Sequence, residues 1–194
     1  LELKYIDLKK IEKNFYRDGF VHVKKIFSKQ EVKDILQDIE MIKKKFKNLK
    51  YKHMHFTKDK KFNTIHNINK FVNKGKIIEL SKDKRLTNII EKIIGKKIFL
   101  RNLEFFLKPK KTGKSAPIHQ DNFFWCTQKG SGITIWIALN NSSKKNGGIF
   151  YFRGSHKLGL LEHEVSYVPG TSQKLKYLKS MKIFKKIYPK LSLG

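Results

Sequence analysis

Residues 119–125, HQDNFFW, place a histidine and an aspartate two positions apart, next to a run of large aromatic side chains. On an extended strand, side chains at positions i and i+2 point to the same face. His119 and Asp121 could therefore hold one metal ion from a single strand. A histidine and a carboxylate are two of the three protein ligands of a facial non-haem Fe(II) site, which leaves coordination positions open for a co-substrate and O2. Such a site also needs a second histidine from elsewhere in the chain.

The same residues have a plainer interpretation. A lone histidine near aromatic side chains is often only packed against them or exposed at the surface, and a His-x-Asp spacing arises often by chance. Phe123, Phe124 and Trp125 follow the aspartate closely. The spacing by itself therefore leaves both a metal site and ordinary packing open.

The length and composition of the chain are those of one globular domain. Its 194 residues suffice for a single domain with a core, and 39% of them are hydrophobic and 12% aromatic. These proportions are typical of a folded protein rather than a disordered one. Residues 1–194 are therefore expected to form a single domain.

The sequence shows neither a membrane span nor an export signal. No apolar run approaches the roughly 20 residues that a membrane-spanning helix needs, and the opening residues LELKYIDLKK contain no apolar signal region. The single cysteine, Cys126, excludes an internal disulfide framework and agrees with a reducing compartment. We therefore expect a cytoplasmic protein.

The chain is strongly basic, with 44 Lys and Arg against 16 Asp and Glu and a formal net charge of +28. Such a charge could indicate a protein that binds nucleic acid or a membrane surface. However, phosphate recognition favours the bidentate fork of arginine, and the lysines here are spread over the whole length. The arginines are Arg17, Arg85, Arg101 and Arg153. This pattern favours a general lysine bias, and nucleic acid is not an expected partner.

Helical periodicity marks the first half of the chain. The predicted helices lie at residues 8–19, 28–47 and 83–95. Ser28 followed by Glu31 is a capping-box signature at the start of the second helix. Gly19 and Gly95 are typical residues for the ends of the first and third helices.

The later part of the chain changes to a β-type pattern with turn residues between the runs. The β-type runs are residues 97–108, 118–126, 132–139 and 147–152, and a short alternating segment precedes them at 20–23. Residues 50–75 look irregular, and 171–188 form a lysine-rich, weakly helical tail. Helices followed by strands predict an α+β chain in which a β-sandwich or barrel carries the N-terminal helices on its outside.

Four segments in order resemble the phytanoyl-CoA dioxygenase family of Fe(II)- and 2-oxoglutarate-dependent oxygenases. They are FYRDGFVHVKKIFSKQEV, HQD, WIALNN and NGGIFYFRGSHKLG, and the similarity runs from about residue 15 to residue 163. The resemblance implies a double-stranded β-helix (jelly-roll or cupin-like) core with N-terminal helices packed outside. It also implies Fe(II), 2-oxoglutarate as co-substrate, O2, and hydroxylation of a small-molecule or acyl-type substrate.

The resemblance assigns roles to individual residues. His119 and Asp121 would be iron ligands, and an aspartate at this position favours hydroxylation over halogenation. Trp136 would lie against 2-oxoglutarate, although it could equally be a core aromatic residue. Lys108 could pair with a carboxylate of 2-oxoglutarate, although a lysine is common anywhere in this chain. His156, in the GSH segment, would form a structural hydrogen bond rather than bind the metal.

The sequence also departs from the family pattern. Arg153 stands where the family usually has proline, a change expected to cost little. After Asp121 the histidines are His156 and His163, and neither has the sequence context of the second iron ligand. The family's arginine that clamps 2-oxoglutarate is not found either. We therefore expect the third ligand and the last strands beyond residue 194, so that this chain binds iron poorly while the full-length protein is competent.

Two other functions remain open on the sequence. One is a basic module that binds nucleic acid, or an oxygenase that acts on nucleic acid. It predicts lysines gathered on one face around the pocket and binding that depends steeply on salt. The other is a jelly-roll protein that has lost its metal site and does not catalyse a reaction.

Overall fold

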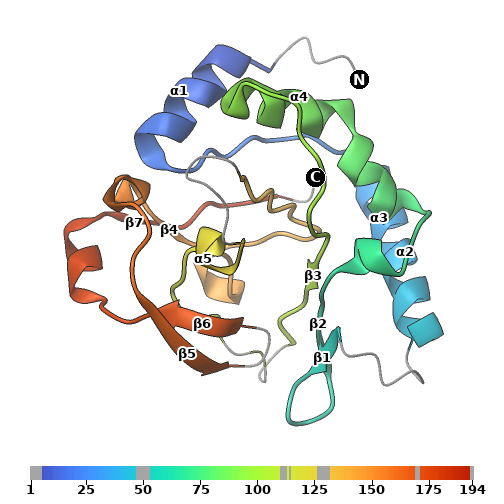
Figure 1. Ribbon diagram of the computed structural model, residues 1–194. Coiled ribbons are helices and arrows are strands. Elements are labelled where there is room, and N and C mark those ends of the chain that lie inside the picture. Colours follow the sequence, from blue (N-terminus) through green and yellow to red (C-terminus); the bar gives the residue numbers. More distant parts are fainter. Residues whose placement is uncertain are drawn as a thin grey trace.

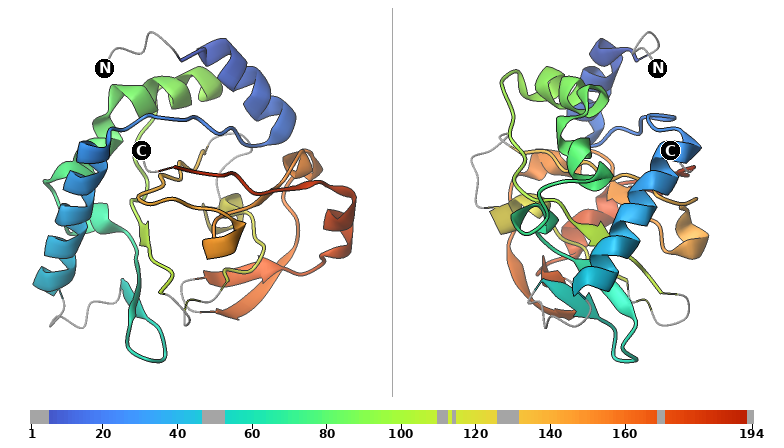
Figure 2. Two further views of the ribbon diagram at one scale, coloured as in Figure 1. Left: turned by 180° about the vertical axis from the view of Figure 1, so that it is seen from behind. Right: turned by 90° about the vertical axis from the view of Figure 1, so that its right-hand side faces the viewer.

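The computed structural model describes residues 6–46, 53–109, 113, 115–125, 132–168 and 171–192. The long helices lie within residues 8–94 and most strands follow them, although a hairpin at residues 54–65 lies between two of the helices. The larger helices lie along the top and one side of the molecule in Figure 1, and the strands and the short helix α5 occupy the remainder. The views in Figure 2 also place these helices at the periphery. Within the described residues, no helix is long and apolar enough to cross a membrane.

The three predicted helices are present, and their ends have the predicted caps. The long helices are α1 (Leu8–Asp18), α2 (Lys29–Phe46) and α4 (Lys84–Ile94), and the short α3 spans Lys76–Glu79. The capping box of α2 is formed, because Ser28 N donates to Glu31 Oε2 at 2.7 Å and Glu31 N donates to Ser28 Oγ at 3.2 Å. Gly19 and Gly95 follow α1 and α4 with φ of 82° and 74°, a conformation that suits glycine.

The helices bury the apolar stripes that their periodicity predicts. The main core cluster joins α2 to α3 and to the hairpin strand β2, and its buried members are Ile35, Ile39, Ile42, Phe46, Ile65, Ile68 and Ile77. A second cluster joins α1 to α4 through Ile11, Ile89 and Ile93. Full burial of each such side chain contributes about 1.5–3 kcal/mol, so the first cluster holds α2 against β2 and the second holds α1 against α4.

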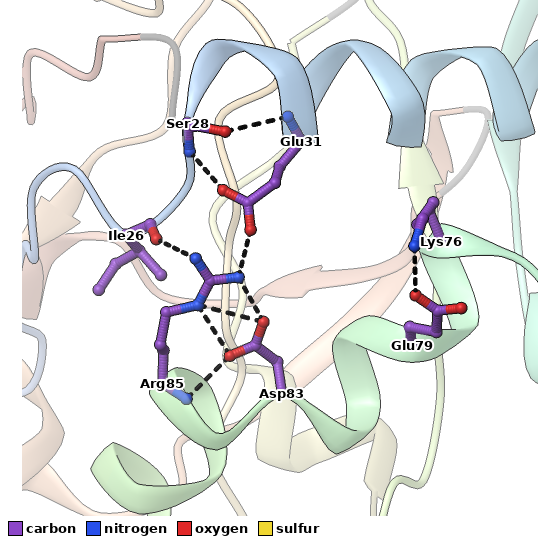
Figure 3. A network of polar contacts seen from close by, with 7 residues as sticks. All are labelled: Ile26, Ser28, Glu31, Lys76, Glu79, Asp83 and Arg85. Atoms are coloured by element: carbon purple, nitrogen blue, oxygen red, sulfur yellow. Dashed lines mark hydrogen bonds and ion pairs between the residues drawn. The ribbon is translucent and has the colours of Figure 1, made fainter. Parts of the chain in front are cut away.

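An arginine connects the first turn of α2 with the start of α4 (Figure 3). Arg85 Nη2 donates to Glu31 Oε1 and to Asp83 Oδ2, each at 2.6 Å, and Arg85 Nη1 donates to the carbonyl of Ile26 at 2.9 Å. The guanidinium group also lies 4.6 Å from the ring centroid of Phe27. Hydrogen bonds from Arg85 outweigh partial burial and lower the pKa of Glu31 to about 2.

The described strands form three small antiparallel sheets. One has the order β1-β2-β3, and the others pair β4 with β7 and β5 with β6. The strands are β1 (Met54–Phe56), β2 (Phe62–Ile65), β3 (Phe105–Phe106), β4 (Tyr151–Phe152), β5 (His163–Val168), β6 (Thr171–Leu175) and β7 (Lys186–Ile187). Short 3-10 turns are η1 (Ile68–Lys70), η2 (Leu80–Lys82), η3 (Lys144–Asn146), η4 (Ser155–Leu158) and η5 (Lys179–Ile183).

Several local predictions were wrong. Residues 121–125 of the predicted strand 118–126 form the helix α5 (Asp121–Trp125), and no strand is found at 20–23 or in the described residues of 132–139. Strands occupy parts of the segments predicted as irregular (50–75) and weakly helical (171–188). Whether a segment forms a strand depends more on the strands beside it than on its own residues. A short aromatic or alternating run is therefore not enough to predict a strand.

The turn after β4 is attached to the end of α1. Arg153 Nε donates to Asp18 Oδ1 at 2.8 Å, and Gly154 N donates to the carbonyl of Asp18 at 2.8 Å. His156 Nε2 lies 3.0 Å from the carbonyl of Tyr16 and donates to it, as expected of a structural hydrogen bond. The backbone N–H of Arg153 donates to the carbonyl of Lys185 at 3.0 Å. A proline at this position could not form that bond.

Candidate metal centre

His119 and Asp121 converge where the chain changes from an extended segment to a helix. His119 precedes α5, and Asp121 is the first residue of that helix. His119 Nε2 lies 3.3 Å from Asp121 Oδ1. The structure thus brings the two side chains together as predicted, but through a change in backbone direction rather than through strand alternation. Figure 1 shows α5 near the centre of the molecule.

Hydrogen bonds hold the atom of each side chain that points away from the other, His119 Nδ1 and Asp121 Oδ2. His119 Nδ1 lies 2.7 Å from the carbonyl of Pro117, so Nδ1 carries a proton and donates it. Asp121 Oδ2 accepts a hydrogen bond from Thr134 Oγ1 at 2.5 Å. Metal-binding histidines commonly donate their other ring N–H to a carbonyl or carboxylate in this way. The two remaining atoms, Nε2 and Oδ1, face each other and fit a shared cation.

The charges of the pair favour its ionised form. Burial acts to lower the pKa of His119, but hydrogen bonds with Asp121 and Pro117 outweigh it and raise the pKa. Burial acts to raise the pKa of Asp121, but hydrogen bonds from His119 and Thr134 outweigh it and lower the pKa. Asp121 therefore presents an anionic oxygen, and a bound cation would take the place of the proton on His119 Nε2.

The part of the chain that the structure describes places no third ligand next to this pair. Among the described residues, no group of three or more His, Cys, Asp and Glu side chains could hold a metal ion. The ring of His163 is occupied on both sides: Nδ1 lies 2.8 Å from the carbonyl of Leu161 and donates to it, and Nε2 accepts from Gln120 N at 3.0 Å. Since His156 is bonded to the backbone of α1, neither later histidine is placed as an iron ligand.

Within the described part of the chain, no hydrogen bond or ion pair joins Lys108 or Trp136 to His119 or Asp121. Lys108 Nζ donates to the carbonyl of Gly147 at 2.8 Å, and desolvation lowers the pKa of this lysine. Trp136 is 38% exposed and lies in a segment without regular secondary structure. Their assignment to 2-oxoglutarate remains a prediction.

The sequence did not point to two residues near Asp121. Thr134 donates a hydrogen bond to the carboxylate. Its position two residues before Trp136 was the signal in the sequence that could have indicated this role. Tyr151 in β4 stacks on Phe20 with ring centroids 4.6 Å apart, and burial together with the charge of Asp121 raises the pKa of Tyr151 to about 12. The phenol therefore stays neutral and can donate a hydrogen bond. Its position in an aromatic run carried no signal of this role.

Replacing Thr134 by valine is expected to weaken metal binding by about tenfold, because partners that orient a ligand typically contribute 10–100-fold. The change keeps the shape of the side chain but removes the hydroxyl that holds Asp121 Oδ2. Thr134→Ser keeps that hydroxyl and is the matched control. Titration with Mn(II), followed by electron paramagnetic resonance, measures the affinity, and equal affinity in the valine and serine variants would contradict the role of Thr134.

Comparison with known proteins shows what this chain is similar to. The chain is 24% identical over 157 residues to a probable alpha-ketoglutarate-dependent hypophosphite dioxygenase of Stutzerimonas stutzeri; the match covers 78% of this chain and 54% of that protein. This chain thus spans about half the length of that relative.

The fold is similar to that of EctD from S. alaskensis. One EctD crystal structure, with 2-oxoglutarate and 5-hydroxyectoine, matches at a TM-score of 0.73 and 18% identity, covering 97% of this chain and 65% of EctD. Another, with bound Fe, matches at a TM-score of 0.74 and 17% identity, covering 97% of this chain and 66% of EctD. These similarities establish the fold. Because the family profile of phytanoyl-CoA dioxygenase (PhyH) matches residues 15–185 and thus most of the sequence, the chain belongs to the phytanoyl-CoA dioxygenase family.

Proposed function

We propose that this protein is an Fe(II)- and 2-oxoglutarate-dependent dioxygenase that hydroxylates a small-molecule or acyl-type substrate. The observation that carries the proposal is the convergence of His119 Nε2 and Asp121 Oδ1, while Pro117 and Thr134 hold the other two atoms. Membership of the family supports the same chemistry. The third iron ligand of the proposed triad, a histidine, is to be sought outside the described residues.

We also propose that the β part of this single domain belongs to a double-stranded β-helix (jelly-roll) core. The antiparallel pairs β4–β7 and β5–β6 and the outer position of the large helices support this assignment. The similarity to EctD over 97% of the chain supports it as well. In such a core the metal motif lies inside, where surrounding strands exclude water.

Each residue of the site has a defined task in this proposal. His119 Nε2 and Asp121 Oδ1 would bind Fe(II), and the Pro117 carbonyl would keep the imidazole proton on Nδ1 so that Nε2 is available. When bound, Fe(II) with 2-oxoglutarate and O2 supplies the oxidising chemistry, in which 2-oxoglutarate becomes succinate and CO2 and a substrate C–H bond becomes C–OH. Trp136 would shield the co-substrate from water, and the ammonium of Lys108 would pair with a co-substrate carboxylate.

The test is the formation of succinate by the full-length protein. Protein expressed and reconstituted anaerobically with Fe(II) is expected to release succinate from 2-oxoglutarate once O2 is admitted. Omitting either Fe(II) or O2 is expected to reduce the release to background. His156→Ala changes a histidine outside the site and is expected to leave the release intact. Release that does not require Fe(II) would contradict the proposal.

A second candidate function is a jelly-roll protein without catalytic activity. The observation that favours it is that no third ligand accompanies His119 and Asp121 among the described residues. This alternative predicts that the full-length protein releases no succinate and that its affinity for Mn(II) does not depend on His119.

A further inference from the structure

Gln120, between His119 and Asp121, is fastened to the segment that leads into β5. Its Nε2 donates to the carbonyl of Gly159 at 2.8 Å, and its Oε1 accepts from Leu161 N at 2.8 Å. Both polar ends of the side chain are thus bonded to the backbone on either side of residue 160. Gln120 faces this segment and is not available to a ligand of the metal centre.

The backbone of Gln120 is held by His163. Gln120 N donates to His163 Nε2 at 3.0 Å, and the proton on His163 Nδ1 is directed to the carbonyl of Leu161, 2.8 Å away. These two bonds require the neutral imidazole with its proton on Nδ1. Phe123, in α5, stacks on the same ring with a centroid separation of 4.1 Å and an interplanar angle of 24°. His163 therefore touches the chain on both sides of Asp121.

The β5–β6 hairpin makes a further contact with the segment that carries His119 and Asp121. His163 and Leu175 are cross-strand partners, and Leu175 N donates to the carbonyl of Ile118 at 2.8 Å. The backbone is thereby tied at residue 118 and again at residue 120. Figure 1 shows the hairpin next to α5.

The position of these bonds has a consequence for the ligand atoms. The backbone changes direction between His119 and Asp121. Residues 119–121 are not part of a β-strand, so pairing with a neighbouring strand does not fix the orientation of their side chains. Metal coordination tolerates errors of only about 0.2 Å in ligand distance. Rotation of the peptide at residue 120 would separate His119 Nε2 from Asp121 Oδ1, which now lie 3.3 Å apart.

We propose that His163 and Gln120 are positioning residues for the metal motif, with His163 in its Nδ1-protonated form as the acceptor that fixes the Gln120 peptide. This proposal rests on the proposed function, since it concerns the geometry of the same metal ligands. The two residues act through His119 and Asp121 and do not contact the ion.

The test compares metal affinity and ligand geometry in matched variants of the full-length protein. His163→Leu removes the acceptor, and Gln120→Met removes the two side-chain bonds at similar volume. His163→Gln is the rescue variant, because its amide oxygen can take the place of Nε2 as acceptor. His156→Leu removes a histidine that is also bonded to a backbone carbonyl but lies outside the motif. Mn(II) titration gives the affinity, the visible spectrum of the Co(II) form reports ligand geometry, and thermal unfolding reports stability.

His163→Leu and Gln120→Met are each expected to weaken Mn(II) binding about 10–100-fold and to change the Co(II) spectrum. His163→Gln should recover most of the affinity, and His156→Leu should lower thermal stability without a change in affinity or spectrum. If His163→Leu does not fold, Gln120→Met and His163→Gln decide the question.

Two results would overturn the proposal in different ways. Wild-type affinity and spectrum in folded His163→Leu or Gln120→Met, or an equal loss in His156→Leu, would reject the positioning role and leave the proposed function intact. Mn(II) binding by the wild-type protein that is indifferent to His119→Ala and Asp121→Ala would reject the metal centre itself, and the positioning role with it.

Discussion

Replacing His119 or Asp121 by alanine is expected to weaken Mn(II) binding by at least about 100-fold and to abolish succinate formation. Residues that merely orient a ligand contribute 10–100-fold, so removal of a ligand atom should cost at least the upper end of that range. Loss of His119 removes the nitrogen donor, and loss of Asp121 removes the anionic oxygen 3.3 Å away. Mn(II) is a suitable probe because it accepts the same nitrogen and oxygen ligands as Fe(II).

The measurement is a Mn(II) titration of each variant together with the succinate assay. His156→Ala is the control, because this histidine is bonded to the carbonyl of Tyr16 rather than to the metal motif. Circular dichroism spectra matching the wild type would show that the variants are folded. Unchanged turnover or affinity in either alanine variant would reject the assignment of that residue.

Replacing Arg85 by methionine is expected to lower the free energy of unfolding by about 2–4 kcal/mol, because hydrogen bonds to charged groups contribute about 1.5–3 kcal/mol each and their loss leaves partners unsatisfied. Arg85 bonds to Glu31, Asp83 and the carbonyl of Ile26, and its side chain is only 20% exposed. These bonds join the starts of α2 and α4 (Figure 3). Arg101→Met changes an exposed arginine and is the matched control. Urea unfolding measures both.

The same substitution should change how stability depends on pH. Hydrogen bonding to Arg85 lowers the pKa of Glu31 from 4.5 to about 2, so the stabilisation is fully present above pH 4.5 and is lost as the pH falls to about 2. Hydrogen bonding to Arg85 also lowers the pKa of Asp83, so the stabilisation from Asp83 is likewise lost as the pH falls. The difference in unfolding free energy between wild type and Arg85→Met should therefore shrink across this range. If the unfolding free energies of the wild type and Arg85→Met fell in parallel from pH 5 to pH 2, this account would be contradicted.

Features with short-range causes were predictable from the sequence. The capping box of Ser28 and Glu31 and the glycines after α1 and α4 act within one helical turn, so each signal lies beside the structure that it produces. The metal motif was also visible, because His119 and Asp121 are two positions apart and stand in order with other family segments. Their role as iron ligands stays a prediction.

Features with long-range causes were not predictable. Residues 121–125 look like a strand by composition, yet they form α5, whose Phe123 stacks on His163 of the β5–β6 hairpin. Arg153 was expected to be a nearly neutral replacement for proline, whereas its guanidinium group and backbone N–H reach Asp18 and Lys185. These partners come from distant parts of the chain, and nothing in the local pattern specifies them.

The sequence by itself determined the N-terminal helices, the family and the two candidate ligands, because periodicity, caps and motifs are written in neighbouring residues. Only the tertiary structure decided how the side chains of the two candidate ligands are oriented. Thr134, His163 and the 159–161 segment reach the motif across 13 to 43 positions of sequence. Hydrogen bonds over such separations form only after the chain has folded, since their geometry depends on the packing of every element in between.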